Sequence, residues 1–162
     1  MTSGPSTTLL HLLGRTPVRL MVGDPRVRVS GLAYDSRKVR AGDAFVALVG
    51  EASDGHDFIP KALAAGAKAL VVSRRPAGAF EGVPVALVDD SRAALATLST
   101  AWFRRPSRRL EVLGVTGTNG KTTVTYLLQS LVAASGGRAA VLGTTGYRWQ
   151  GAVTPLANTT PE

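Results

Sequence analysis

The stretch Leu-Glu-Val-Leu-Gly-Val-Thr-Gly-Thr-Asn-Gly-Lys-Thr-Thr, residues 110–123, predicts the fold of the second part of the chain. Its apolar beginning, residues 110–115, has the length and β-branched content of a buried strand. A loop with two glycines and an asparagine follows, and from Val124 onward apolar residues recur at helical spacing as far as Gly136-Gly137. We therefore expect a strand, a glycine-rich loop and a helix, in that order.

This order is typical of P-loop nucleotide-binding proteins. Glycines let backbone amides approach a triphosphate, and the first turn of the helix adds unpaired N–H groups and the positive end of its dipole. Lys121 would contact the β- and γ-phosphates, and the Thr122 hydroxyl would ligate Mg²⁺. Because Val115 stands where the common motif has its first glycine, the loop is the tighter form that runs from Gly117 to Thr123. The alternative is an ordinary Gly-Asn turn.

The composition limits the class of protein. Of the 162 residues, 44% are hydrophobic, as in a globular protein with a core, and no apolar run has the length that spans a bilayer. The absence of cysteine excludes disulfides and thiolate sites and fits a cytoplasmic protein. The net charge is +8, but the arginines are scattered, except in a linker around Pro106. Without interleaved aromatic residues this charge indicates solvated surface rather than a nucleic-acid site.

The first part of the chain alternates strands and helices. We expect residues 1–8 to be disordered, a short helix over 8–13, and strands over 27–33, 44–48, 69–72 and 85–88. Asp57 is expected to cap a helix that ends at Gly66, and Asp90 another that buries Ala94, Leu95, Leu98, Trp102 and Phe103. These elements predict an α/β domain with a mostly parallel sheet over residues 1–107, followed by the start of a P-loop domain over 108–162.

We expect the second domain to be incomplete. One further strand is expected over residues 139–142, and residues 148–162 are polar and loop-like. A P-loop fold with two strands cannot close its core, so we expect the chain to be a fragment of a longer protein.

Several motifs together resemble the N-terminal part of the Mur ligases of bacterial cell-wall synthesis. They are Asp35-Ser36-Arg37, residues 42–48, residues 54–58, residues 117–123, the Gly-Thr-Thr-Gly-Tyr of 143–147 and the Thr-Thr-Pro-Glu of 159–162. The first three are shared with the MurF type, whereas the last two indicate the MurE type, so the chain looks most like MurE.

The resemblance implies an ATP-dependent amide ligase that adds diaminopimelate or lysine to UDP-N-acetylmuramoyl-L-Ala-D-Glu through an acyl phosphate. It implies that ATP binds at Gly117, Thr118, Asn119, Gly120, Lys121, Thr122 and Thr123, with Mg²⁺ near Thr122. It also implies that Ser36, Tyr34 and the 51–53 loop contact the uridine end of the substrate, and that Asn158, Thr159 and Thr160 contact its sugar–dipeptide part. The family's catalytic residues would lie beyond Glu162, so we expect that the chain does not complete ligation alone. We also expect a monomer that binds neither nucleic acid nor membrane.

Other hypotheses stay open. The chain could derive from another Mur ligase, above all the MurF type, or be a non-catalytic nucleotide-binding module; a nucleic-acid binder is the weakest option. Asp35 and Arg37 could form a surface ion pair of little energetic value. His56 beside Asp57 suggests an acid/base pair, although a helix entry is the better explanation. The sequence does not show which amino acid is added.

Overall fold

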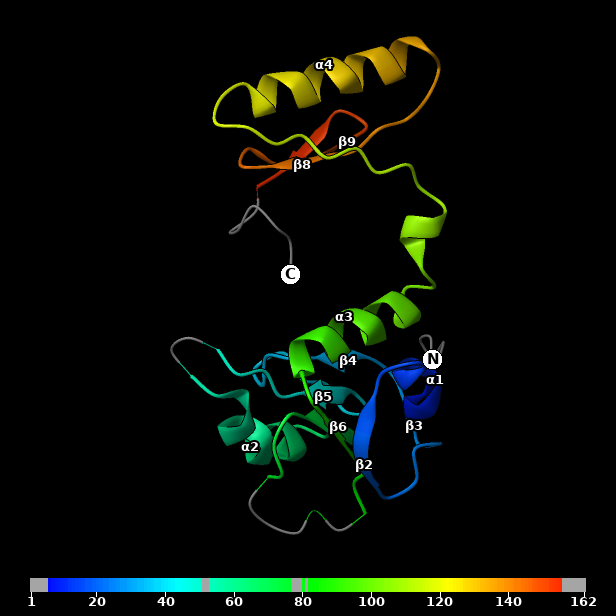
Figure 1. Cartoon of the computed structure of the whole chain (residues 1–162), viewed down its shortest axis with the longest axis vertical. Coiled ribbons are helices and arrows are strands. Elements are labelled where there is room, and N and C mark those ends of the chain that lie inside the picture. The colour runs from blue at the N-terminus through cyan, green and yellow to red at the C-terminus, as the bar shows by residue number, and fades with distance from the viewer. Residues whose placement is uncertain (1–5, 51–52, 77–79, 81, 156–162) are drawn as a thin grey trace. The chain divides into compact units, whose positions relative to one another are not determined.

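The computed structural model describes residues 6–50, 53–76, 80 and 82–155. The chain forms two compact units, Met1–Leu110 and Glu111–Glu162, each of which is described by itself (Figure 1). No helix among the described residues has the length and apolar character that crossing a membrane requires.

The first unit contains a five-stranded sheet in the order β2-β7-β6-β5-β4. Four strands are parallel, which confirms the mostly parallel sheet: β4 (Leu32–Ala33), β5 (Ala44–Val46), β6 (Ala69–Val72) and β7 (Val85–Val88). The fifth, β2 (Val18–Val22), pairs with β7 in the antiparallel direction and was not predicted. Its side chains are half-buried or exposed, so it lacks the continuous apolar run that marks the inner strands.

Both faces of this sheet are buried, which explains why β5 and β6 are apolar throughout. One face carries Val46, Val71 and Val88 and is covered by α1 (Leu9–Leu13) and α3 (Ser91–Trp102). The other carries Phe45, Leu70 and Val72 and is covered by α2 (Ile59–Ala64). Successive residues of a strand point to opposite faces, so each strand contributes to both cores.

The helix caps agree in part with expectation. Asp90 caps α3, as predicted, by accepting hydrogen bonds from the amides of Arg92 and Ala93. The prediction that Asp57 is an N-cap is wrong: Asp54 caps the 3₁₀ turn η1 (Gly55–Phe58), which precedes α2. An aspartate that can bond the amide two residues on competes well for this position, and it starts the turn before Asp57 is reached.

Three further expectations for the first unit need correction. The segment 27–33 is not one strand, because β3 (Arg28–Val29) pairs with β1 (Thr7–Thr8) and only β4 joins the main sheet. Residues 7 and 8, expected to be disordered, therefore form a strand; residues 1–5 lie outside the described part. Phe103 follows the last turn of α3 and is exposed instead of packing inward with Leu98.

The second unit consists of α4 (Lys121–Ala134) and an antiparallel sheet in the order β10-β9-β8. Strands β8 (Val141–Gly143) and β9 (Gly146–Trp149) form a hairpin around Thr144 and Thr145, and β10 (Ala152–Thr154) pairs with β9. The expectation that residues 148–162 are loop-like is thus wrong for β9 and β10, while residues 156–162 lie outside the described residues.

The strand predicted over residues 110–115 is absent. These residues form no strand. The side chains of Leu110, Val112 and Leu113 are exposed, that of Val112 by 76%, and Val115 is half-buried. A buried strand needs neighbouring strands to pair with its amides and carbonyls, and β8, β9 and β10 pair only with one another in the described part of this unit. Likewise α4 has no buried residue, although its apolar residues follow the predicted helical spacing.

Candidate functional site

The loop before α4 has the geometry of an anion-binding turn. Gly120, the N-cap residue of α4, has φ 76° and has no side chain that could cap the helix. Gly117 has φ 146°. Both values lie where residues with a Cβ are disfavoured, so the two glycines are needed for the shape of the loop. The amide of Val124 bonds to the Gly120 carbonyl, but in the described chain the three preceding helix amides have no backbone acceptor. Those three N–H groups and the helix dipole can receive a phosphate.

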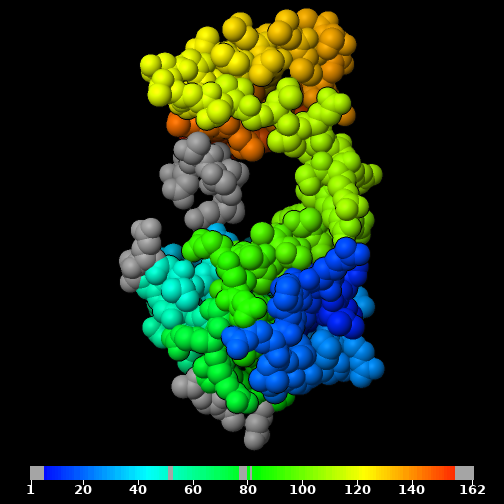
Figure 2. All heavy atoms as spheres, in the orientation of Figure 1, coloured from blue at the N-terminus to red at the C-terminus, as the bar shows by residue number. Residues whose placement is uncertain are grey.

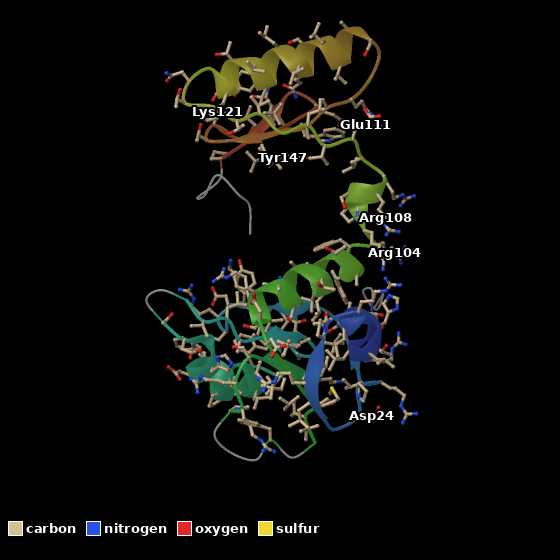
Figure 3. The ribbon with its side chains drawn as sticks, in the orientation of Figure 1. Asp24, Arg104, Arg108, Glu111, Lys121 and Tyr147 are labelled. Atoms are coloured by element: carbon tan, nitrogen blue, oxygen red, sulfur yellow. The ribbon has the colours of Figure 1, made fainter. Side chains whose placement is uncertain are left out.

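Lys121 places its ammonium group on this loop. Its Nζ donates hydrogen bonds to the carbonyl oxygens of Gly117, at 2.6 Å, and Thr118, at 3.3 Å. The residue is exposed, at the first turn of α4 (Figure 3). A phosphate bound at the free amides would therefore find a mobile cation beside it. The assignment of residues 117–123 to nucleotide phosphates stays a prediction.

Thr122 suits a role toward a divalent cation. It is exposed in the first turn of α4, and its hydroxyl makes no hydrogen bond within the described residues; only its carbonyl is engaged, by the Thr125 hydroxyl at 2.8 Å. The described chain contains no group of three acidic, histidine or cysteine side chains that could hold a metal alone. A single hydroxyl fits Mg²⁺ that takes most of its ligands from phosphates and water.

The β8–β9 hairpin reaches the same helix. The Tyr126 hydroxyl lies 2.7 Å from that of Thr145 in the hairpin turn, and the Arg148 guanidinium lies 5.0 Å from the Tyr126 ring centre. Neither Tyr126 nor Arg148 was predicted from the sequence to belong to the site. Helical spacing was the available signal. Tyr126 lies five residues after Lys121, which places it about 140° around the axis of α4 from that residue.

In the first unit, the loops after the parallel strands gather at one edge of the sheet. Tyr34 and Ser36 follow β4; Tyr34 is half-buried against the α1–α3 core and Ser36 is largely buried. Between them Asp35 accepts hydrogen bonds from the backbone and guanidinium of Arg37, and chiefly this guanidinium lowers the pKa of Asp35 to about 2. The carboxyl ends of strands in open α/β sheets are where ligands bind.

A buried histidine joins two of these loops. The side chain of His56, after β5, is 1% exposed, and its Nε2 accepts hydrogen bonds from the backbone amides of Ser73, at 3.1 Å, and Arg74, at 3.4 Å, after β6. Nδ1 must then carry the proton, which it donates to Asp54 Oδ1 at 2.5 Å. Arg74 contacts the other oxygen of Asp54 at 2.9 Å and also pairs with Asp57. His56 is thus a positioning residue and not half of an acid/base pair with Asp57.

We expect this network to make the first unit sensitive to acid. Hydrogen bonds from the His56 amide, its imidazole and the Arg74 guanidinium lower the pKa of Asp54 to about 2, from 3.8. A carboxyl whose pKa is lower in the folded state stabilises the fold above pH 4, and this contribution is lost as the pH falls toward 2. The Asp54 side chain is 26% exposed, so after allowance for solvent screening we expect about 1 kcal/mol.

Asp54→Asn should remove this part of the pH dependence, since asparagine keeps the cap but does not titrate. The measurement is urea unfolding between pH 6 and pH 2, followed by Trp102 fluorescence in a Trp149→Phe background. Trp102 packs against the core of the first unit, and the chain has two tryptophans. If the Asn variant loses stability on acidification as steeply as the parent, the network does not hold the Asp54 charge.

The structure therefore arranges the predicted residues in two places. Residues 117–123 surround the start of α4 in the second unit, and Tyr34 and Ser36 lie at the carboxyl edge of the sheet in the first. Ser53 follows β5 at the same edge. Residues 51 and 52, and Asn158, Thr159 and Thr160, lie outside the described residues. Their roles stay predictions.

Comparison with known proteins matches both units to one family. The model described as "Mur ligase family, catalytic domain" matches residues 28–103, and that described as "Mur ligase middle domain" matches residues 115–162. The ligase from Geobacter sulfurreducens named UDP-N-acetylmuramoyl-L-alanyl-D-glutamate–2,6-diaminopimelate ligase is 44% identical over 143 residues, which are 86% of this chain and 27% of that protein. The ligase of the same name from Gloeobacter violaceus is 41% identical over 97% of this chain and 32% of its own length.

Solved structures agree. A structure of a UDP-N-acetylmuramoyl-L-alanyl-D-glutamate–2,6-diaminopimelate ligase superposes with a TM-score of 0.71 and 27% identity, over 93% of this chain and 30% of that one. MurF from Acinetobacter baumannii gives 0.62 and 29%, over 82% of this chain and 29% of its own. The chain spans about 30% of the length of these relatives. The two family models together cover most of it and follow one another as the two units do, and the chain belongs to the Mur ligase family.

Proposed function

We propose that this chain supplies the nucleotide-phosphate loop and the uridine-end contacts of a MurE-type ligase. In the proposed reaction, ATP phosphorylates the free carboxylate of UDP-N-acetylmuramoyl-L-Ala-D-Glu, and an amine then displaces the phosphate to form an amide. All curated relatives described above carry 2,6-diaminopimelate in their names, which favours this amine over lysine. A MurF-type ligase is the second candidate, because MurF structures also superpose on the chain.

One observation carries the proposal: the start of α4 offers three amides that have no backbone acceptor among the described residues, beside the Lys121 ammonium. We assign the triphosphate of ATP to these amides and to the loop from Gly117 to Thr123. Phosphoryl transfer depends mainly on positioning and on charge stabilisation. The amides of this loop would position the phosphates, and the Lys121 ammonium would stabilise their charge. Lys121 would leave the two carbonyls that it now contacts and pair with the β- and γ-phosphates.

Thr122 is the residue that we assign to Mg²⁺. Bound there, the ion would neutralise charge that develops on the phosphates. The hydroxyl needs no rearrangement of its own, since it is exposed and makes no hydrogen bond in the described structure. Loss of Mg²⁺ to a chelator is expected to weaken nucleotide binding at residues 117–123 and to leave the first unit unchanged.

For the first unit we propose contacts with the uridine end of the substrate, made by Tyr34, Ser36 and the loop that contains Ser53. Their common position after parallel strands supports this assignment. The His56 network holds the neighbouring loops together without a ligand, which reduces the ordering entropy that binding would cost. For Asn158, Thr159 and Thr160 we retain the predicted contacts with the sugar–dipeptide part.

A chimera tests the whole proposal. Residues 1–162 would replace the matching segment of the Geobacter sulfurreducens ligase, and diaminopimelate-dependent phosphate release would be measured with UDP-N-acetylmuramoyl-L-Ala-D-Glu. We expect activity within about tenfold of the parent ligase, since the two chains are 44% identical over 143 residues. A folded chimera that binds ATP but releases no phosphate in the presence of diaminopimelate would support the non-catalytic nucleotide-binding module instead. One that binds neither ATP nor the UDP substrate would contradict both.

A further inference from the structure

A groove in the first unit lies outside both regions described so far. It has a volume of about 860 Å³ and is bounded by the end of α1, the second half of α3 and the turn η2 (Pro106–Arg108). Figure 2 shows the atoms of the α1 region beside those of the end of α3. All lining residues belong to the first unit, so the groove does not depend on how the two units are placed.

Every charged side chain that lines the groove is basic. No carboxylate lines it, and among the described residues none of its arginines pairs with one, whereas Arg26, Arg37 and Arg74 elsewhere in the unit all do. The basic side chains that line it are those of His11, Arg15, Arg104, Arg105 and Arg108. Like charges gathered at a concave surface concentrate a positive potential there, and nothing in the described structure neutralises it.

The backbone holds two of these arginines in an unfavourable conformation. Arg104 and Arg105 have φ values of 57° and 55°. Their amides bond to the carbonyls of Ala101 and Thr100, at 3.0 and 2.8 Å, which is the Schellman termination of a helix. Glycine usually occupies the first of these positions because a Cβ is disfavoured there. The turn brings Ser107 and Arg108 back to the same groove.

Two ordinary explanations do not account for this arrangement. Basic residues near the end of a helix interact favourably with its dipole, but this applies to Arg104 and Arg105 and not to Arg15 or Arg108. Solvated surface charge would not require two successive arginines at left-handed φ. Residues held in such conformations occur preferentially at ligand sites.

The groove is also distant from Ser36. Helix α3 begins directly after β7, at the carboxyl edge of the sheet, and its 12 residues extend for about 18 Å. The groove lies beside the far half of this helix. A ligand there would be separate from one that contacts Tyr34 and Ser36.

We propose that this groove binds a small anion with two or more linked phosphates, either inorganic or the phosphate chain of a nucleotide. Planar guanidinium groups bind phosphate oxygens in pairs, and several of them can surround a phosphate chain. The volume is that of a pocket for a small molecule and exceeds the needs of one phosphate ion. The charge converges on one bounded cavity instead of following a stripe, which favours a small anion over nucleic acid. Figure 3 shows Arg104 and Arg108 where the chain leaves α3.

Titration of the ¹⁵N-labelled full chain with inorganic triphosphate tests this proposal by NMR. We expect saturable shifts of the amides of Gly14, Thr97, Thr100 and Ala101, fitted separately from those of residues 117–123. Failure at the loop with binding at the groove would overturn only the proposed function, and the reverse only this proposal. Inorganic phosphate should bind the groove at least tenfold more weakly than triphosphate.

Three single variants, one of them a control, test which arginines bind the triphosphate. Arg108→Ser should weaken triphosphate binding at the groove about tenfold, whereas Arg109→Ser, which removes the same charge one residue away and outside the lining, should change it less than twofold. Arg104→Gly should also weaken binding about tenfold while it keeps the turn, because glycine tolerates left-handed φ. Its far-UV circular dichroism should match that of the parent.

Several results would overturn the proposal. They are an absence of groove shifts at 10 mM triphosphate, equal losses for Arg108→Ser and Arg109→Ser, equal affinity for phosphate and triphosphate, and tighter binding of a 12-base-pair DNA duplex than of triphosphate. The last result would make the groove part of a nucleic-acid surface. ADP and pyrophosphate identify the source: equal affinities indicate recognition of phosphates alone, and tighter binding of ADP indicates a nucleotide.

Discussion

Replacement of Lys121 by alanine is expected to reduce ATP-dependent phosphate release by the chimera about 100-fold or more. The side chain is the one cation within hydrogen-bonding distance of the loop among the described residues, through the Gly117 and Thr118 carbonyls. Removal of one such charge from a phosphoryl-transfer site typically costs two to three powers of ten in rate. Nucleotide affinity of the chain itself, followed by the amides of residues 117–123, should fall at least tenfold.

Lys61→Ala is the matched control for this experiment. Lys61 is an exposed lysine in α2 of the first unit, so its removal changes the net charge equally without touching the loop. Phosphate release should stay within twofold of the parent. If Lys121→Ala leaves turnover unchanged, the loop does not hold a triphosphate, and the non-catalytic module becomes the better hypothesis.

His56→Ala is expected to lower the free energy of unfolding of the first unit by about 3 kcal/mol. The substitution leaves a cavity, because the imidazole is buried, and it removes the acceptor of the Ser73 amide and the donor to Asp54. Both losses separate the loops after β5 and β6, so amide exchange at Ser73 and Arg74 should also accelerate.

Urea unfolding of the Trp149→Phe chain, followed by Trp102 fluorescence, measures this effect. His11→Ala is the control, since the chain has two histidines and His11 is exposed. That variant should lie within 0.5 kcal/mol of the parent, as surface substitutions usually do. A loss below about 1 kcal/mol for His56→Ala would show that the hydrogen bonds across the two loops contribute little.

The sequence predicts best where a short segment carries its own signal. The apolar runs of β5 and β6, the Asp90 cap and the loop before α4 all follow from residue type and spacing alone. Strand β2 has a mixed pattern, and its place at the sheet edge depends on pairing with β7, which is more than 60 residues away in the sequence. For residues 110–115 a strand was predicted that does not form, since they have strand character but no strand of the described chain pairs with them.

For the site residues, too, local features could be predicted from the sequence and contacts between distant segments could not. The roles proposed for Gly117, Gly120 and Lys121 could be predicted because a phosphate loop is local in sequence. The contacts of His56 with Ser73 and Arg74 could not be, because they join loops 17 and 18 residues apart through the amides of the backbone. The basic groove depends on a helix termination that arginine, by its usual preferences, does not favour.

The hydrogen bonds of Lys121 to the loop carbonyls have a consequence for selectivity. For an anion to pair with the Lys121 ammonium, the ammonium must first leave the Gly117 and Thr118 carbonyl oxygens. These two carbonyls therefore compete with the anion for the lysine. The attraction between the ammonium and a singly charged ion such as chloride is too weak to replace these two hydrogen bonds. A triphosphate presents several charged oxygens at once and interacts more strongly. We therefore expect the loop to bind nucleotides in preference to the abundant monovalent anions of a cell. Lys121 would exchange its carbonyl partners for phosphate oxygens each time a nucleotide binds.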